Sequence, residues 1–299
     1  MFHAVSAYCN AGFSTLSQSI YETGFRFNYT LQLIIVATFV LGGLGFPIVV
    51  NITSYLKHKV LYFLRFNSKI KNHKPWMLNI NSRITLVTTL SLTATAFVFF
   101  LILEYNNTLA EHSLYGKLVN ALFGAATPRT AGFNSVDMTA LAFPTIMITF
   151  LLMWIGASPA STGGGIKTST FAIATLNILS LAKGKQRIEI FRREIADISV
   201  KRAFATIALS LIIIGFGVIL ITIFDPEKGL LNIAFECFSA YSTVGLSLGI
   251  TGSLSTASKL VVIVVMFVGR VSMLSIIVAI FKKIKHKNYR YPSEEITIN

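Results

Sequence analysis

Long, uncharged apolar runs dominate the chain. Four runs contain no Asp, Glu, Lys or Arg, and a fifth contains one arginine; they cover residues 27–56, 84–103, 138–166, 203–224 and, with the arginine, 260–281. A transmembrane helix needs about 20 mostly apolar residues. Each run is long enough to cross a bilayer, so the pattern predicts an all-α polytopic membrane protein.

Shorter apolar segments alternate with these runs and reveal a repeat. The run 84–103 is followed by a segment too short to span, 118–126, then by the polar stretch TPRTAGFNS and a returning run. The same order begins again at residue 203, with the short segment 230–241 and the stretch STVGLSLG. The chain opens with the tail of another such unit: a short helix, CNAGFS and a returning helix over about 31–56.

The composition supports a membrane protein and indicates its orientation. Only 13% of the residues are charged and the mean hydropathy is +0.68, whereas soluble domains carry about 25% charged residues. Of the 26 Lys and Arg, seven lie in 57–83, seven in 183–202 and five in 282–290. By the positive-inside rule these stretches are cytoplasmic. Topology therefore explains the basic pI, and no nucleic-acid partner is expected.

Each short helix leads into a segment with one central glycine: Gly12, Gly132 or Gly245. A helix too short to span must enter the membrane and return, and its non-helical return is tolerated only where protein buries it or water lines it. Glycine permits backbone angles closed to other residues, so carbonyl oxygens can turn toward a shared axis. Rings of carbonyls replace the hydration shell of an alkali cation, and helix C-terminal ends favour a cation there. The repeated segments are therefore predicted to be walls of one pore.

These segments carry a family resemblance. CNAGF, RTAGF and STVGL resemble the filter segments of the Trk/Ktr/HKT superfamily of K+ transporters, and GASPASTGGGIKTST (156–170) and FVGRVSMLS (267–275) match further motifs. The nearest likeness is to the bacterial Ktr membrane subunit, over nearly the whole chain. The resemblance implies a multi-pass protein of the bacterial plasma membrane that transports K+, with Na+ coupling left open. It implies no enzyme activity and no covalently bound cofactor.

The resemblance also implies a set of ion-binding residues that act through their backbone carbonyls. They are Asn10, Ala11, Gly12, Phe13, Thr130, Ala131, Gly132, Phe133, Thr243, Val244, Gly245 and Leu246.

A glycine triplet should interrupt the returning run 138–166. Gly163, Gly164 and Gly165, with a proline upstream, are expected to break the helix in mid-membrane. The break resembles the intramembrane gate loop of the family, and Lys167 near the path would repel K+. A packing kink is the alternative.

Arg270 lies eleven residues into a 22-residue apolar run. Charges at the bilayer centre are costly and usually face a cavity or a partner. Arg270 resembles the arginine that family members place beneath the filter, where it would stabilise the closed gate loop; a purely structural arginine is the alternative.

The resemblance suggests how the chain is divided. We expect a remnant of the second pore repeat (1–57), a cytoplasmic linker (58–82), the third repeat with the gate loop (83–182), a second linker (183–202), the fourth repeat (203–281) and a cytoplasmic tail (282–299). Family members have four repeats around one pore, so the first repeat is expected to be missing and the chain to be truncated at its N-terminus. A non-conducting fragment with an assembly or regulatory role is the alternative function.

Partners follow from the same resemblance. Ktr membrane subunits pair as dimers on a cytoplasmic nucleotide-binding ring of the RCK type, which implies a homodimer and such a ring for this chain. The basic stretches 57–74 and 183–202 are candidate contact surfaces, with anionic lipid as the alternative explanation.

Other sequence features argue against a phosphate-binding loop, a disulfide or zinc site, and an intramembrane enzyme. STGGGIKTST contains glycines and a lysine, but Ile166 separates Gly165 from Lys167, which departs from a phosphate-binding P-loop. Two cysteines cannot build a disulfide framework or a zinc site. No paired acids, Ser/His set or metal cluster lies within the apolar runs, so an intramembrane enzyme is not predicted.

Two further features receive structural interpretations. GGLGFP (42–47) repeats a filter superficially, but it lies in the middle of a returning run and is expected to support close helix packing. Glu236 lies within the last short helix; a partly solvated surface carboxylate is favoured, with attraction of cations at the pore mouth as the alternative.

Overall fold

The computed structural model describes residues 1–64, 78–185, 187–271 and 278, with the side chains of 61–64 excepted. Most of the first basic linker, the end of the last returning run and the tail 282–299 lie outside the described residues. The regular secondary structure of the described residues is helical apart from one short hairpin. Its main elements are α1 (Phe2–Tyr8), α2 (Tyr29–Leu44), α3 (Phe46–Leu64), α4 (Ile80–Glu104), α5 (Leu114–Ala126), α6 (Phe143–Trp154), α7 (Thr168–Ala182), β1 (Glu189–Ile190), β2 (Arg193–Glu194), α8 (Asp197–Phe224), α9 (Leu230–Tyr241) and α10 (Thr256–Val271).

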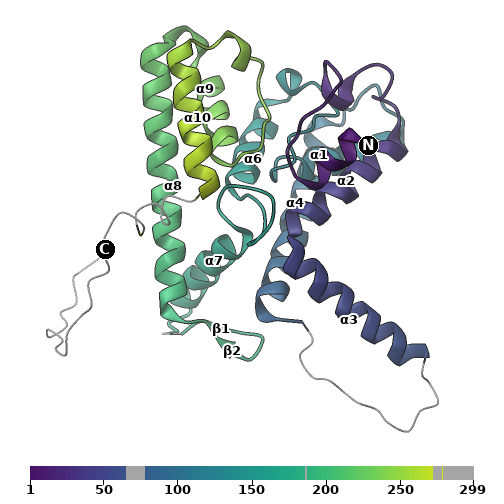
Figure 1. Ribbon diagram of the computed structural model, residues 1–299, viewed down its shortest axis with the longest axis vertical. Helices are drawn as coiled ribbons and strands as arrows, with labels where there is room; N and C mark the ends of the chain where they lie inside the picture. The colour runs from purple at the N-terminus through teal and green to yellow at the C-terminus, as the bar shows by residue number, and fades with distance from the viewer. Residues whose placement is uncertain (65–77, 186, 272–277, 279–299) are drawn as a thin grey trace, which may run out of the picture.

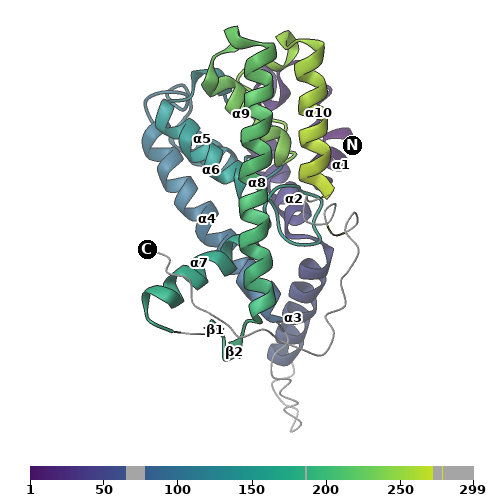
Figure 2. The same cartoon turned by 90° about the vertical axis from the view of Figure 1, so that its left-hand side faces the viewer.

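Two long helices set the height of the molecule. α4 has 25 residues and α8 has 28, and each is apolar enough to cross a membrane alone. α8 runs from the top of the molecule to near the β1–β2 hairpin in two perpendicular views (Figures 1 and 2). Both helices expose large apolar side chains, such as Leu90 (73%) and Ile212 (65%). Exposed apolar surface of this extent is what a lipid-facing helix presents.

The short helices pack between the long ones. α5 packs on α4 and α2, and α9 packs on α8, α10 and α6. α1 lies against α2 in the same way. Each short helix contributes buried apolar residues to a core, for example Ala7, Phe123 and Phe235. The three glycine segments follow directly from these anchored helix ends.

The first returning run is not one helix, which differs from the expectation for 31–56. α2 and α3 meet at an angle of 105°, and Gly45 at the break has a positive φ of 81°. A Cβ on Gly45 would lie 2.8 Å from the Ala160 carbonyl oxygen, in the loop between α6 and α7. The bend therefore combines a left-handed residue with a close backbone approach that only glycine permits. The motif GGLGFP marks this bend, and it also provides the close packing expected of it, because a Cβ on Gly42 would overlap the Tyr8 carbonyl oxygen at the end of α1.

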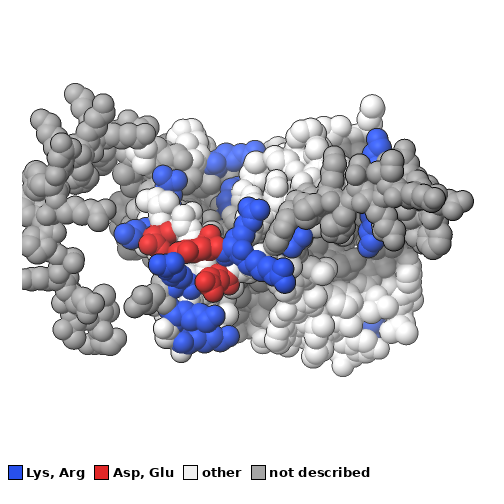
Figure 3. All heavy atoms as spheres, turned by 90° about the horizontal axis from the view of Figure 1, so that it is seen from below, with Lys and Arg blue, Asp and Glu red and all other residues white. Residues whose placement is uncertain are grey.

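The basic stretch 183–202 lies at one end of the molecule. The end of α7, the hairpin β1–β2 and the start of α8 meet there (Figure 1), and Lys and Arg gather on this face with a few acids among them (Figure 3). Arg187 and Glu194 form an ion pair of 3.5 Å, with both side chains more than half exposed. Such exposed pairs contribute about 0–1 kcal/mol, so the charges act mainly as a basic surface.

Candidate functional site

The three glycine segments come together although more than a hundred residues separate neighbouring ones. A Cβ on Gly12 would lie 2.9 Å from the Ala131 carbonyl oxygen. A Cβ on Gly132 would overlap the Val244 carbonyl oxygen and lie 3.2 Å from the Gly12 Cα. We number these segments after the repeats that carry them: second (Gly12), third (Gly132) and fourth (Gly245). The second segment therefore touches the third, and the third touches the fourth, backbone against backbone.

The same backbone conformation occurs in all three segments. Each glycine has a positive φ, and so has the residue two positions before it: 50° at Asn10, 75° at Thr130 and 52° at Thr243. Positive φ is uncommon for residues other than glycine, especially for a β-branched threonine. Left-handed residues therefore alternate with residues of negative φ, a pattern that sequence periodicity cannot reveal.

The N–H groups of these segments are tied back to the short helices. Ala11 donates to the Ser6 carbonyl (2.9 Å), Ala131 to Thr127 (3.0 Å) and Val244 to Ser239 (2.9 Å). In contrast, within the described part of the chain, no hydrogen bond ends on the carbonyl oxygens of 10–12, 130–132 or 243–246. Among the described residues, these carbonyls therefore have no protein partner, whereas the carbonyls of Phe13 and Phe133 accept hydrogen bonds from hydroxyl groups.

Hydroxyl side chains on the short helices hold the same segments, and the sequence analysis did not identify them. Ser6 donates to the Phe13 carbonyl (2.7 Å), Thr127 donates to the Phe133 carbonyl (2.5 Å), and Ser239 accepts from the Gly245 N–H (3.1 Å). The signal was present: each repeat has Ser or Thr five or six residues before its glycine.

The glycine loop between α6 and α7 lies directly against the segments. A Cβ on Gly163 would overlap the Thr130 hydroxyl, and one on Gly164 would overlap the Thr243 hydroxyl. The loop is closed at its base by a parallel bridge between Ile155 and Ile166. It lies in the middle of the molecule (Figure 1), next to the third and fourth segments at once.

Two basic side chains bind carbonyls of this loop. Lys167 Nζ donates to the Gly163 carbonyl oxygen (2.6 Å). Arg270, in the last described turn of α10, donates from Nη1 to the Thr162 carbonyl oxygen. All five expected gate residues, Gly163, Gly164, Gly165, Lys167 and Arg270, therefore lie in or against this loop.

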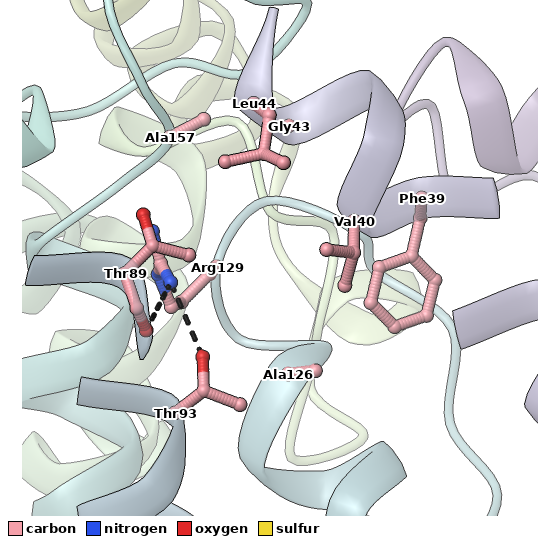
Figure 4. A pocket seen from close by; sticks show the side chains of 9 residues that line it. All are labelled: Phe39, Val40, Gly43, Leu44, Thr89, Thr93, Ala126, Arg129 and Ala157. Carbon is pink, nitrogen blue, oxygen red and sulfur yellow. Dashed lines mark hydrogen bonds between the residues drawn. The ribbon is translucent and has the colours of Figure 1, made fainter. Parts of the chain in front are cut away.

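Arg129 begins the motif RTAGF, and its role was not predicted from the sequence. Its guanidinium reaches α4, where Nη1 donates to the Thr89 carbonyl and the Thr93 hydroxyl, and Nη2 to the Thr89 hydroxyl, each at 3.3 Å (Figure 4). A cavity of about 30 Å³ lies beside it, lined also by Gly43 and Ala157. Arg129 thus fastens the third segment to α4.

Glu236 is not a surface carboxylate. Only 5% of it is exposed, and its Oε1 accepts hydrogen bonds from the Ser247 and Thr251 hydroxyls. Burial follows from the packing of α9 against three neighbouring helices. The expectation of a partly solvated side chain was therefore wrong.

The second and fourth segments face each other across open space. A cavity of about 570 Å³ separates them and is lined by Ala11 and Phe13 on one side and by Gly245, Glu236 and Arg270 on the other. Phe13 is 71% exposed. The three segments therefore enclose an axis on two sides and leave the third side open.

Comparison with known proteins identifies a matching family and similar proteins. The TrkH family, described as cation transport protein, matches residues 1–291. The chain is 37% identical over 298 residues to the Ktr system potassium uptake protein B of Bacillus subtilis, covering 99% of this chain and 62% of that protein. It is 35% identical over 304 residues to the potassium/sodium uptake protein NtpJ of Enterococcus hirae, covering 100% and 63%. The chain thus spans about three fifths of the length of these relatives.

A solved structure has a similar fold. The potassium transporter TrkH of Vibrio parahaemolyticus superimposes with a TM-score of 0.71 at 18% identity, over 93% of this chain and 57% of that one. The predicted all-helical, multi-pass membrane fold and the predicted family are both confirmed. With a family match over almost its entire length and a relative above 30% identity, this chain belongs to the TrkH family of cation transport proteins.

Proposed function

We propose that the chain contributes a K+-conducting pathway for uptake across the plasma membrane, with the carbonyls of the three glycine segments coordinating the ion. One observation carries this proposal: the carbonyls of 10–12, 130–132 and 243–246 have no protein partner within the described chain, although the segments converge. Unpaired carbonyls at membrane depth are costly. A dehydrated cation would satisfy them.

The backbone conformation supports the same proposal. Alternation of left-handed and right-handed residues points successive carbonyls to one side of a chain and the N–H groups to the other. The N–H groups bond to the short helices, so the carbonyls are proposed to face the axis. α1, α5 and α9 end immediately before the segments, and their C-terminal dipole ends favour a cation.

The glycine loop is proposed as the gate of this pathway. It lies against Thr130 and Thr243, and Lys167 and Arg270 both bind its carbonyls. Two positive charges beside the path would repel K+, and their hydrogen bonds would hold the loop in place. Opening is proposed to require release of these bonds.

The transported ion is inferred from the relatives. They are named as potassium uptake and potassium/sodium uptake proteins, so K+ is the proposed substrate and coupling to Na+ stays open. A homodimer on a cytoplasmic nucleotide-binding ring of the RCK type is the proposed assembly. The basic surface of 183–202 is its proposed contact, whereas much of 57–74 lies outside the described residues.

A non-conducting role in assembly or regulation is the second candidate. The cavity of about 570 Å³ between the second and fourth segments would leave the coordination shell of a bound ion open on one side. If nothing fills that side, an ion there would keep part of its hydration shell and selectivity would be lost.

Rb+ uptake separates the two candidates. The 299-residue chain would be expressed in cells deficient in K+ uptake, with Gly245→Asp as the control and membrane insertion verified for both. Uptake that the control abolishes supports the conducting pathway. No uptake despite insertion would leave the assembly role as the better explanation.

A further inference from the structure

We propose that Glu236 is a positioning residue: through Ser247 and Thr251 it holds the backbone after Gly245 in the position that lets the fourth segment prefer K+ over Na+. This inference rests on the conducting function proposed above and assigns that function a residue outside the coordinating segments.

The contacts of Glu236 organise a whole loop. Its Oε1 accepts from the Ser247 hydroxyl and, at 2.7 Å, from the Thr251 hydroxyl. The two hydroxyl oxygens are themselves 2.8 Å apart, so the single hydroxyl hydrogen of Thr251 is shared between Glu236 and Ser247, and Ser247 Oγ also accepts from the Gly249 N–H (2.9 Å). One buried carboxylate oxygen therefore gathers the residues 247–251.

The same helix face holds the segment at a second point. Ser239 lies three residues after Glu236, so both side chains lie on one face of α9. Ser239 accepts from the Gly245 N–H at 3.1 Å. The backbone of 245–247 is thus fixed at both ends by side chains one helical turn apart, and the Leu246 carbonyl lies between these two attachments.

The second repeat (1–57) has two comparable attachments. Ser6 donates to the Phe13 carbonyl (2.7 Å), and His3 Nε2 is hydrogen-bonded to the Ser14 hydroxyl at 3.0 Å. His3 and Glu236 each lie nine residues before their glycine, and the serine follows two residues after it. Two repeats therefore use the same arrangement with different chemistry.

The third repeat lacks the outer attachment. Phe123 occupies the position of Glu236 and has no polar group. Asn134 occupies the position of the serine and donates to the Val136 carbonyl of its own loop, at 3.5 Å. This difference supplies a matched control position within the chain.

The carboxylate distinguishes the fourth repeat. When ionised, it makes hydrogen bonds about twice as strong as those between neutral groups. In the described part of the chain Glu236 is held by hydroxyls, and neither the Arg26–Glu111 nor the Arg187–Glu194 ion pair involves it. It also lines the 570 Å³ cavity together with Gly245 and Leu246, where a passing cation would offset its charge.

The test measures ion preference and loop rigidity in the full chain, purified in detergent. Thermal unfolding would be followed over a range of KCl and NaCl concentrations, because an ion that binds the folded state raises the midpoint. Hydrogen exchange of the peptide 242–252 would be measured in parallel. The variants are Glu236→Gln, which keeps the shape, and Ser247→Ala; Asn134→Ala is the control.

We expect the wild type to bind K+ in preference to Na+. Glu236→Gln and Ser247→Ala should reduce that preference by about fivefold to tenfold, which corresponds to one weakened hydrogen bond, and should speed exchange in 242–252. Asn134→Ala should preserve both.

Three results would overturn the inference. Unchanged exchange in both variants would mean that Glu236 does not hold the loop. Faster exchange with unchanged ion preference, or an equal loss of preference in Asn134→Ala, would remove its role in selectivity. A wild type with neither K+ preference nor Rb+ uptake would overturn the conducting function itself, and the selectivity role with it, so the two failures are distinguishable.

Discussion

The side-chain amide of Asn10 and the hydroxyl of Thr130 share a hydrogen bond of 3.2 Å across 120 residues of sequence. Both residues are buried, both have positive φ, and each stands two residues before its glycine. The bond therefore joins equivalent positions of the second and third segments, and it fixes their relative height along the proposed pathway.

Breaking this bond should reveal energetic coupling between the two segments. Asn10→Ala and Thr130→Val should each destabilise the folded chain, and the double variant should lose less than the sum. We expect a coupling free energy of about 0.5–1.5 kcal/mol, the usual net value of one buried hydrogen bond. The thermal unfolding midpoints of the four proteins provide the measurement. Strict additivity would show that the bond contributes nothing to stability.

Substitution in the glycine loop should be far more harmful than substitution on a lipid-facing helix. A Cβ on Gly164 would overlap the Thr243 hydroxyl and lie 2.9 Å from the Ser242 carbonyl oxygen, so Gly164→Ala should cost about 1–3 kcal/mol. The matched control is Gly215→Ala on α8, where nothing lies within 4 Å. There alanine should be neutral or stabilise by up to about 1 kcal/mol. Equal midpoints for the two variants would contradict the tight packing of the loop.

Loss of the loop lysine should increase ion flux. Lys167→Met removes both a positive charge and the bond to the Gly163 carbonyl (2.6 Å). Hydrogen bonds to charged groups contribute about 1.5–3 kcal/mol, so the open fraction, and with it Rb+ uptake, should rise by at least about tenfold. Lys259→Met is the control, since Lys259 binds the Gly252 carbonyl in the loop that precedes α10. Unchanged or slower uptake in Lys167→Met would argue against the gate.

His112 should make the stability of the chain depend on pH. It lies in the loop between α4 and α5, where burial, and next the positive charge of Arg26, lower its pKa below the ordinary value of 6.5, although Glu111 opposes this shift. The folded state therefore favours the neutral imidazole. Stability is present above pH 6.5 and is lost as the pH falls toward the folded pKa, because the unfolded chain then binds more protons.

Thermal unfolding of the wild type and His112→Gln checks this prediction. The midpoint of the wild type should fall between about pH 7.5 and about pH 5.5, and the fall should be smaller in the variant. Parallel pH profiles would assign the dependence to other groups. Because His112 lies away from the glycine segments, neutral-pH Rb+ uptake serves as the control for folding.

Much of the local structure could be predicted from residue patterns. The apolar runs at 84–103 and 203–224 correspond to α4 and α8, and the triplet 163–165 lies in the break between α6 and α7. These features depend on propensities that act over a few residues: helix length, apolar content and the backbone freedom of glycine. The three-segment repeat was visible for the same reason.

Long-range packing decided the rest. The bend at Gly45 arises because the Ala160 backbone approaches it, and a run of apolar letters does not encode which loop will come close. Glu236 is buried because three helices cover α9, whereas its sequence neighbourhood was equally compatible with a solvated face. Arg129 finds its partners forty residues away on α4.

The sequence by itself determined the class of protein, the helical segments and the glycine positions, since hydrophobic length and residue-specific backbone freedom are local properties. Only the tertiary structure decided that the second segment contacts the third, that the third contacts the fourth, and that a cavity separates the fourth from the second. These contacts depend on how segments more than a hundred residues apart fill the same space, and burial is a property of that shared space rather than of any single segment.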